Sequence, residues 1–395
     1  MQNGIGNTRK IRVAFFLNLN EEWLGGVNYF KNLFLVITEN KSLNIEPVIF
    51  IPSKTKCELL NGFPKIEIIK TEALKRGTFL WLVNKLSSKI FSYDCYLDYL
   101  LSKYNVDVIS HISGVINISG IPKIAWIPDF QHHYLPDFFS AVESKNLDKN
   151  FLNLAKFSEC VILSSYNAKK DFLNFCSTYD YKAKVLQFVV PFTRKEYSRE
   201  DLVKKYKIKE DFFYIPNQFW KHKNHKVVLE ALKILKENGE DNVQVLCSGN
   251  TQDYRNVEYF NDIITYMNNN NLQNQFIILG RIPYDDVQAL ILECKALINP
   301  SLFEGWNTMV EEAKSLGKRI ILSDLPVHKE QNPEGGIYFD RNNPNQLAQV
   351  MRHVLSENDD KVRMTVENIE NSLARRKKNM ANKYREILEF VIKDE

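Results

Sequence analysis

The amino-acid sequence predicts two α/β domains, each built around a doubly wound parallel sheet. Short, continuously apolar runs alternate with helix-length segments along the whole chain, and a charged stretch interrupts this rhythm once, just after Pro191. Continuously apolar strands separated by helices are typical of parallel sheets that are buried on both faces. The length of 395 residues also favours two domains, because it is large for one hydrophobic core.

The predicted strands form one series before Pro191 and a second series after it. The first series comprises residues 11–19, 46–52, 65–70, 106–112, 123–128, 160–165 and 184–190. The second series comprises residues 212–216, 243–249, 275–280, 295–300 and 319–324. The predicted domains are therefore 1–192 and 193–374. A long helix ends the chain, and it carries an apolar stripe at Met380, Tyr384, Ile387 and Val391 that must be buried.

Composition places the chain among soluble globular proteins. The apolar fraction is 44%, the charged fraction is 25%, and the net charge of +4 is too balanced to indicate a nucleic-acid partner. The six cysteines are scattered and show no Cys-x-x-Cys spacing, which is typical of free thiols in a reducing compartment. We find no apolar signal core at the N-terminus and no apolar run of about 18–20 residues. We therefore expect a cytoplasmic protein.

Residues 299–324 read as a strand, a loop, a helix and a second strand. Thr308 and Glu311 have the spacing of a capping box, whereas Glu312 lies at the border of the apolar face of the helix. A helix N-terminus favours phosphate, so Glu304 and Glu312 are placed to bracket a phosphate-bearing ligand. The alternative from spacing alone is a capped helix with solvated acids.

A basic loop follows the first strand of the second series. It contains Lys221, His222, Lys223 and His225, and Asn224 stands where a helix N-cap is expected. Cations concentrated at the carboxyl end of a strand predict a clamp for a diphosphate. The alternative is a solvated basic loop.

Two stretches of the first domain also follow strands. Asp129, His132 and His133 come after residues 123–128, and an Asp beside a His suggests a polarised base or a pair that orients a hydroxyl. Metal binding is the weaker interpretation there, because no third and fourth ligand is evident. Gly25 and Gly26 stand between the first strand and its helix, where glycine permits close approach of a phosphate or sugar. The spacing is not G-x-G-x-x-G.

No two aspartates are separated by a single residue, so the Asp-x-Asp motif that holds Mg²⁺ or Mn²⁺ in many nucleotide-sugar enzymes is missing. We expect no metal, and a diphosphate leaving group would then be neutralised by lysine and a helix dipole.

Taken together, these stretches resemble glycosyltransferase family 4. PSLFEGWNTMVEEAKSLGKRIILSD resembles the glutamate-seven-glutamate signature of that family, and YIPNQFWKHKNHKVVLEAL resembles its domain-opening loop. The resemblance implies the GT-B fold, with two Rossmann-like domains, a central cleft and a C-terminal helix, about 375–395, that packs on the first domain. It also implies metal-independent, retaining transfer from a nucleotide-diphosphate sugar, which is a co-substrate; no cofactor is expected.

The resemblance assigns roles to the residues around the predicted helix. Glu312 would hold the ribose hydroxyls, and Glu304 would hold the hydroxyls of the donor sugar near the anomeric carbon. The backbone amides of Asn307, Thr308 and Met309 would bind the distal phosphate.

Further donor-binding residues follow from the same resemblance. Lys223 would neutralise the diphosphate, and Gly26 would approach it from the first domain. Arg281 and Ile282 would lie beside the base, and Gly249 is counted with this group.

The sequence departs from the family pattern at two places. Where many relatives have Gly-Arg, this chain has Asn217 and Gln218, which are counted with the donor-binding residues. Either His222 and Lys221 compensate for the missing arginine, or the affinity for the donor is low.

Where many relatives have His-Asp, this chain has Pro128 and Asp129. Asp129 and His132 are therefore the candidates for the role of that histidine and are counted with Glu304 as catalytic.

We therefore expect a hexosyl-type glycosyltransferase that extends a glycan or lipid-linked saccharide in cell-surface polysaccharide biosynthesis. The alternatives are another GT-B enzyme, such as a nucleotide-sugar epimerase or a glycan phosphorylase, and a non-catalytic sugar-nucleotide-binding subunit. Residues 71–104 mix lysine and arginine with Phe79, Leu80 and Trp81. They predict either a helix on the inner membrane surface, which would give peripheral membrane contact, or a core helix with a basic face.

Overall fold

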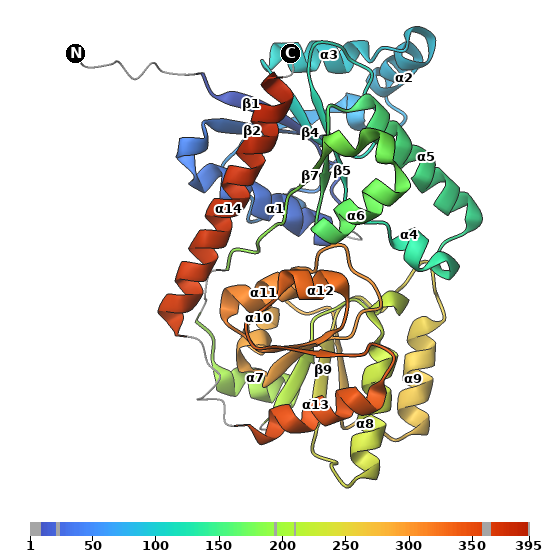
Figure 1. Ribbon diagram of the computed structural model, residues 1–395, viewed down its shortest axis with the longest axis vertical. Helices are drawn as coiled ribbons and strands as arrows, with labels where there is room; N and C mark the ends of the chain where they lie inside the picture. The colour runs from blue at the N-terminus through green and yellow to red at the C-terminus, as the bar shows by residue number, and fades with distance from the viewer. Residues whose placement is uncertain (1–8, 21–23, 193–195, 209–210, 358–364, 394–395) are drawn as a thin grey trace, which may run out of the picture. The chain divides into compact units, whose positions relative to one another are not determined.

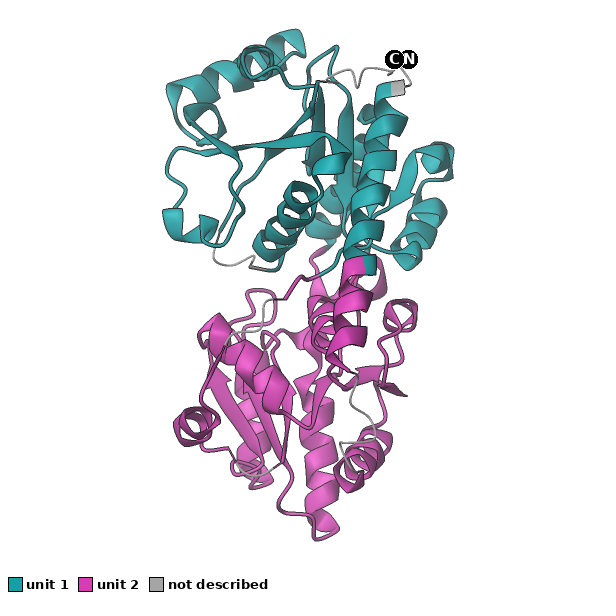
Figure 2. Ribbon diagram, turned by 90° about the vertical axis from the view of Figure 1, so that its left-hand side faces the viewer, with its two compact units in different colours: residues 1–130, 141–189, 375–395 teal, residues 131–140, 190–374 magenta. Residues whose placement is uncertain are grey.

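The computed structural model describes residues 9–20, 24–192, 196–208, 211–357 and 365–393, and the chain divides into two compact units. Figure 2 shows them in different colours. Unit 1 comprises Met1–Phe130, Ala141–Val189 and Arg375–Glu395, and unit 2 comprises Gln131–Ser140 and Val190–Ala374. The sequence placed residues 131–140 in the first domain, but the structure groups them with the second.

Aromatic rings explain why residues 131–140 group with unit 2. The ring of Tyr134 lies 5.1 Å from that of Phe303, measured between centroids. The ammonium of Lys221 lies 4.9 Å from the centre of the Phe138 ring. Sequence periodicity carries no information about such contacts, since the partners lie far apart along the chain.

Unit 1 is built on a seven-stranded parallel sheet with the strand order β3-β2-β1-β4-β5-β6-β7 (Figure 1). Its strands are β1 (Ile11–Phe16), β2 (Ile45–Pro52), β3 (Glu67–Thr71), β4 (Val108–Ile112), β5 (Lys123–Ile127), β6 (Cys160–Leu163) and β7 (Ala183–Val185). Its helices are α1 (Leu24–Glu39), α2 (Phe79–Phe91), α3 (Cys95–Lys103), α5 (Ala141–Phe157), α6 (Tyr166–Phe175) and the last part of α14 (Val366–Lys393).

Unit 2 is built on a six-stranded parallel sheet with the order β10-β9-β8-β11-β12-β13. Its strands are β8 (Phe212–Ile215), β9 (Gln244–Ser248), β10 (Phe276–Gly280), β11 (Ala296–Asn299), β12 (Ile320–Ser323) and β13 (Gly336–Phe339). Its helices are α4 (Gln131–Tyr134), α7 (Arg199–Tyr206), α8 (His225–Glu237), α9 (Tyr259–Asn269), α10 (Tyr284–Glu293), α11 (Thr308–Leu316), α12 (Pro326–Gln331) and α13 (Pro344–Ser356).

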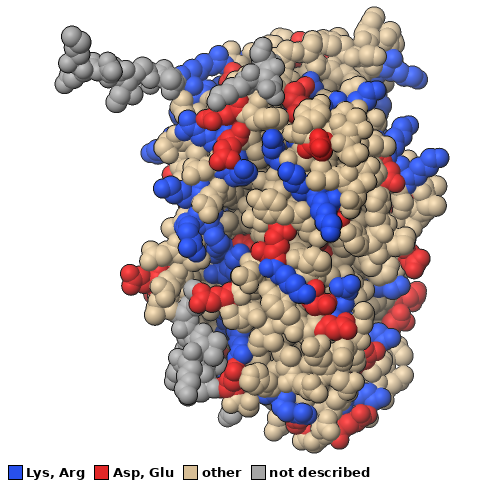
Figure 3. Space-filling model, viewed as in Figure 1, with Lys and Arg blue, Asp and Glu red and all other residues tan. Residues whose placement is uncertain are grey.

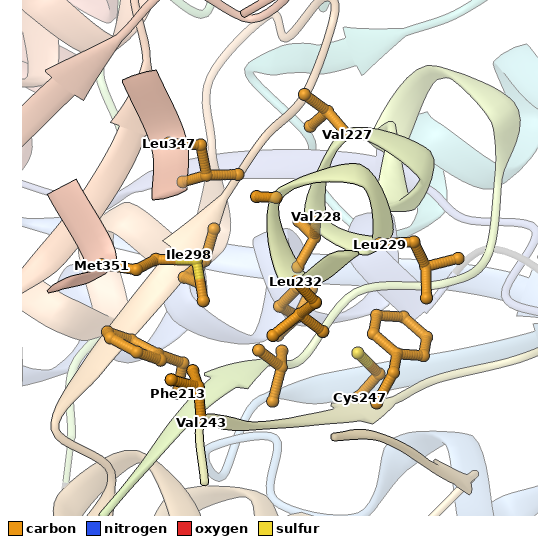
Figure 4. Close-up of a cluster of buried hydrophobic side chains, with 14 of the residues drawn as sticks. Phe213, Val227, Val228, Leu229, Leu232, Val243, Cys247, Ile298, Leu347 and Met351 are labelled. Atoms are coloured by element: carbon orange, nitrogen blue, oxygen red, sulfur yellow. The ribbon is translucent and has the colours of Figure 1, made fainter. Parts of the chain in front are cut away.

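Alternate residues of the unit 2 strands enter two separate cores. Phe213 of β8 packs with Val228 and Leu232 of α8 and with Met351 of α13 (Figure 4). Its neighbour Tyr214 packs on the other face of the sheet with residues of α10 and α11. Burial on both faces explains why the strands are continuously apolar in the sequence.

The predicted fold class is confirmed in each unit: both are doubly wound α/β domains with a parallel sheet. Each strand predicted from an apolar run is present, although most are a few residues shorter than predicted. The sequence missed β13, an edge strand with only Phe339 fully buried. Its mixed composition lacks the continuous apolar run that identifies the central strands.

The C-terminal helix α14 buries the stripe that the sequence singled out. Met380, Tyr384, Ile387 and Val391 are each at most 3% exposed. The Tyr384 hydroxyl donates to Ser110 Oγ in the middle of β4, over 2.9 Å. These contacts account for the grouping of residues 375–395 with unit 1.

Residues 71–104 form two helices with different surroundings. Helix α3 buries Leu97, Leu100 and Leu101 and is an ordinary core helix. Helix α2 buries only Ser87 and leaves most of its large apolar side chains exposed. No helix among the described residues is long and apolar enough to cross a membrane.

Candidate functional site

The candidate site lies at the carboxyl ends of the central strands of unit 2. In a doubly wound sheet, ligands bind where the strand order reverses, outside the carboxyl ends of the strands. Here that point lies between β8 and β11, which are paired. The loop after β8 carries Lys223, and the loop after β11 carries Glu304. The topology therefore brings together two residues that are 81 positions apart.

Lys223 and Glu304 form a buried ion pair. Lys223 Nζ donates to Glu304 Oε1 over 2.6 Å, and the two side chains are only 15% and 10% exposed. The Ser301 hydroxyl donates to the same carboxylate oxygen over 2.6 Å. Burial by itself would raise the pKa of Glu304, but the Lys223 charge and these hydrogen bonds lower it below the usual value. Glu304 is therefore an ionised carboxylate at neutral pH.

Asn224 holds the basic loop against the loop that carries Glu304. Its backbone is in the left-handed region, with φ at 55°. Its side-chain amide donates to the carbonyls of Pro300 and Arg341, over 3.1 and 3.0 Å. Asn224 is the N-cap residue of α8, as predicted, but its side chain makes no capping hydrogen bond, because the amide serves these carbonyls instead.

The basic loop presents fewer cations than the sequence suggested. Burial, together with the nearby Lys223, lowers the pKa of His222 and of His225 to about 3, so both imidazoles are neutral at pH 7. The ammonium of Lys221 lies over the ring of Phe138. His222 therefore cannot supply the charge of the missing arginine, and Lys223 is the cation of this loop that contacts Glu304.

The N-terminus of α11 is capped differently from the prediction. The N-cap is Asn307, whose side chain accepts from the Val310 amide over 3.1 Å, so the proposed box of Thr308 and Glu311 is wrong. Glu311 is buried rather than solvated. It accepts hydrogen bonds from Lys314 and from Gln331 of α12, each over 3.1 Å. Helix α12 covers this side of α11, which periodicity alone does not reveal.

Gln331 also limits which backbone amides face a ligand. Its side-chain oxygen accepts from the backbone amide of Asn307 over 3.2 Å, so this amide is already engaged. Thr308 and Met309 occupy the first two positions of the helix, where an amide has no acceptor within the helix. Of the three predicted phosphate-binding amides, these two remain available from α11.

Glu312 has surroundings unlike those of Glu304. It is 8% exposed and accepts a hydrogen bond from the Tyr284 hydroxyl at the start of α10, over 2.9 Å. Burial raises the pKa of Glu312 to about 7, and the hydrogen bond from Tyr284 only partly opposes this. This carboxyl therefore gains and loses its proton near neutral pH.

Several buried polar atoms at this edge find no hydrogen-bond partner among the described residues. They include Nδ2 of Asn217 after β8, Nδ2 of Asn299 at the end of β11, and Nε2 of His328 in α12. A buried polar group without a partner costs roughly 1–3 kcal/mol. Such groups are typical of a place that binds a polar molecule.

The remaining predicted residues of unit 2 surround these groups. Gly249 has φ +152°, and a Cβ there would lie 2.3 Å from the Asn217 carbonyl oxygen, so only glycine fits beside the backbone of Asn217 and Gln218. Arg281 is exposed and Ile282 is partly buried in the connection between β10 and α10.

Three predicted residues lie outside this group. Gly26 is buried in the first turn of α1, which begins at Leu24, so the two glycines belong to the helix and not to the preceding turn. Asp129 is partly buried just after β5 and belongs to unit 1. His132 is buried in α4 of unit 2, with its ring 4.3 Å from that of His133.

Sequence reasoning missed four residues of this site. Ser301, Tyr284 and Gln331 contact the three glutamates directly, and Tyr134 lies against Phe303 beside Glu304. Only Ser301 had a local signal, as a hydroxyl three residues before Glu304 in the same loop. The other three come from different elements, and only the tertiary structure brings them to the site.

Part of the chain matches a known protein family. Residues 198–371 match the family described as glycosyl transferases group 1. The chain is also 24% identical over 213 residues to the O-antigen chain mannosyltransferase RfbU of Salmonella typhimurium. That alignment covers 54% of this chain and 55% of RfbU, so the chain spans about half the length of this curated relative.

Solved structures share the fold over nearly the whole chain. HepE of Anabaena, solved in complex with UDP and glucose, superposes with a TM-score of 0.69 at 15% identity and covers 96% of this chain and 99% of its own. A glycosyltransferase from Rickettsia africae has a TM-score of 0.69 at 19% identity, covering 98% and 100%. WaaG, a glycosyltransferase involved in lipopolysaccharide biosynthesis, has a TM-score of 0.60 at 15% identity, covering 94% and 95%. The chain thus has the GT-B fold, and residues 198–371 are similar to the glycosyl transferases group 1 family.

Proposed function

We propose that the protein is a retaining, metal-independent glycosyltransferase of family 4. In this proposal it moves a sugar from a nucleotide-diphosphate sugar to a glycan or lipid-linked saccharide during cell-surface polysaccharide biosynthesis. The observation that carries the proposal is the constellation of Lys223, Glu304, the N-terminus of α11 and Glu312 at one edge of unit 2. The family match over this unit and the polysaccharide-related names of RfbU and WaaG support it.

The diphosphate of the donor would be neutralised by Lys223 and by α11. The ammonium of Lys223 and the free amides of Thr308 and Met309 supply positive charge without a metal ion. In the structure Lys223 is paired with Glu304. A bound diphosphate would share or take over this cation, leaving Glu304 to accept hydroxyls of the donor sugar.

The two carboxylates would then hold two different parts of the donor. Glu304 is kept ionised and would accept hydrogen bonds from the sugar near the anomeric carbon. Glu312 would accept hydrogen bonds from the two ribose hydroxyls. HepE was solved with UDP and UDP-glucose, which makes UDP the first nucleotide to test.

The transfer itself would need no strong protein base. The bond between the anomeric carbon and the leaving phosphate oxygen breaks, and the acceptor oxygen bonds to the same face of that carbon. The proton of the acceptor hydroxyl passes to the leaving phosphate oxygen. Asp129, His132 and Gly26 are proposed to assist in binding sugar or phosphate, and we propose that the protein works in the cytoplasm at the inner face of the membrane.

The test replaces Glu304 by Gln, which has nearly the same shape but no charge. We expect sugar transfer, measured as nucleotide release with acceptor, to fall about 100-fold or more, because a charge that acts on the reacting sugar is lost. We expect binding of UDP, measured by thermal shift, to stay at the wild-type level or improve, since Lys223 no longer has an internal partner. Glu334→Gln, at an exposed position, is the matched control.

Other outcomes would point to the alternatives. If wild type and Glu304→Gln bind UDP equally and neither transfers sugar to any acceptor, the protein is a non-catalytic binding subunit. If wild type converts the nucleotide sugar without any acceptor, it is an epimerase. If neither variant binds a nucleotide, the proposed donor site is wrong.

A further inference from the structure

Helix α2 turns its apolar side toward the solvent. Phe79, Leu82, Val83, Leu86 and Ile90 are between 38% and 77% exposed. At 3.6 residues per turn they lie within a stripe about 100° wide along one side of the helix. Isolated exposed apolar residues are common on protein surfaces, but a continuous helical stripe usually marks an interaction site.

Polar side chains on the other side of α2 fix the helix to unit 1. The Asn84 side chain accepts from the Leu97 amide over 3.4 Å, and Ser88 Oγ accepts from the Asn117 side chain over 3.0 Å. Ser87 is buried on the same side. Polar contacts therefore hold the helix on the protein while its apolar stripe stays exposed, whereas an ordinary surface helix buries its apolar stripe.

The charges of α2 are complementary to an anionic surface. Lys85 and Lys89 are its only charged residues, and both lie along one border of the apolar stripe. The ammonium of Lys85 lies 5.5 Å from the centre of the Trp81 ring. Figure 3 shows blue and tan side chains at the corner of the molecule where Figure 1 labels α2.

We infer that α2 lies flat on an anionic lipid bilayer, with Phe79, Leu82, Leu86 and Ile90 among the acyl chains and the two lysines at the phosphates. An apolar stripe flanked by lysines is typical of helices that bind in the plane of a membrane surface. A second copy of this chain is the less suitable occupant, because pairing two such stripes would bring lysines of equal charge together. The inference rests on the proposed function in one respect: binding to the bilayer would bring the enzyme to a lipid-linked acceptor.

This inference narrows what the sequence suggested for residues 71–104. The sequence grouped Leu80 and Trp81 with Phe79, but these two side chains are partly buried and lie off the stripe. Helix α3 is excluded as the contacting element because its leucines are buried in the core.

The experiment measures sedimentation of the full chain with vesicles and needs no enzymatic activity. One set contains phosphatidylcholine alone, and the other contains equal amounts of phosphatidylcholine and phosphatidylglycerol. We expect the wild type to bind the anionic set. We expect Leu86→Ser with Ile90→Ser to weaken this binding at least about tenfold, because two apolar side chains no longer enter the bilayer.

Lysine variants and a control separate charge from apolar contact. We expect Lys85→Gln and Lys89→Gln each to weaken anionic binding about fivefold. Val257→Ser, which alters an exposed apolar side chain of unit 2, should bind as the wild type does. All these side chains are exposed, and unchanged melting temperatures would verify that the variants fold.

Two results would overturn the inference. One is a wild type that does not sediment with anionic vesicles, or stripe variants that bind as strongly as the wild type. The other is a wild-type dimer in light scattering that Leu86→Ser with Ile90→Ser converts to a monomer, since the stripe would then be covered by a second copy. Neither result depends on the proposed glycosyl transfer, whose failure would appear only in the nucleotide and activity measurements.

Discussion

Glu304 and Glu312 lie on either side of the N-terminus of α11, and both are buried, yet their pKa values are shifted in opposite directions. Glu304 has Lys223 and Ser301 as partners, and its pKa is lowered. Glu312 accepts from a tyrosine hydroxyl and has no ion pair with a cation among the residues that the structure describes, and its pKa is raised to about 7. The comparison shows that burial alone does not set the state of a carboxyl; the partner that the fold supplies decides it.

The difference suits the two roles that we propose. A carboxylate that acts on a reacting sugar must be charged whenever substrate arrives, and the ion pair with Lys223 ensures this. A carboxyl that only accepts hydrogen bonds from ribose hydroxyls needs its charge when the ribose is bound. For Glu312, binding and loss of the proton are therefore coupled.

The largest expected effect comes from making Glu304 resemble Glu312 by removing its cation. We expect Lys223→Met to lower the free energy of unfolding by about 3–5 kcal/mol at pH 7, because it leaves a buried carboxylate without a counter-charge. In the wild type, the lowered pKa of Glu304 contributes stability above pH 4.5 that is lost as the pH falls through the folded pKa. In the variant that pKa is raised, so the loss of stability grows as the pH rises.

Urea unfolding of the full chain at pH 5 and pH 8 measures this effect. Lys221→Met is the matched control, since Lys221 lies in the same loop but its ammonium packs on Phe138. A Lys223→Met protein as stable as this control at pH 8 would contradict the importance of the ion pair.

A smaller effect of opposite sign is expected at Glu312. Its folded pKa of about 7 lies above the unfolded value of 4.5, so this carboxyl costs no stability below pH 4.5, destabilises the fold increasingly as the pH rises from 4.5 to about 7, and keeps its full cost above that. Glu312→Gln never ionises and keeps an acceptor for Tyr284. We therefore expect it to stabilise the ligand-free protein by about 2–3 kcal/mol at pH 8.5 and by much less at pH 5.

Urea unfolding at those two pH values, with Glu334→Gln as the control, tests this expectation. An equal gain at both pH values would show that the effect does not come from ionisation of Glu312. A loss of stability at pH 8.5 would show that the buried charge is compensated.

The smallest expected effect concerns the pH dependence of nucleotide binding. If ribose hydroxyls donate to ionised Glu312, the affinity for UDP rises as the pH increases through about 7. Tyr284→Phe removes the hydrogen bond that lowers this pKa, so we expect the midpoint to move upward by roughly half a unit to one unit. Calorimetric titration with UDP between pH 6 and pH 9 measures the midpoint.

Tyr197→Phe is the matched control for this measurement, because Tyr197 donates to Glu293, a glutamate outside the candidate site. It should leave the midpoint unchanged. An affinity for UDP that does not vary with pH in the wild type would remove Glu312 from the proposed ribose contact.

The sequence predicted the sheets well because burial on both faces leaves a continuous apolar run. Strands such as β8 and β11 were located within a few residues, whereas the edge strand β13 was missed because most of it is only partly buried. The candidate site was predicted as far as it depends on local spacing. Lys223, Glu304, Glu312 and the start of α11 are close to where the motifs placed them.

Only the tertiary structure decided how these residues are used. Residues from α12 and α10 engage the Asn307 amide and the Glu312 carboxyl, and burial neutralises His222. The same holds for helix α2: its apolar stripe can be read from the sequence, but the exposure of that stripe to solvent cannot. The sequence by itself determined most of the segments that form strands and helices, because these follow from local periodicity, and it placed the acids and lysines on them. Charge state, pairing and exposure depend on contacts between residues far apart in the chain, which exist only once the chain has folded.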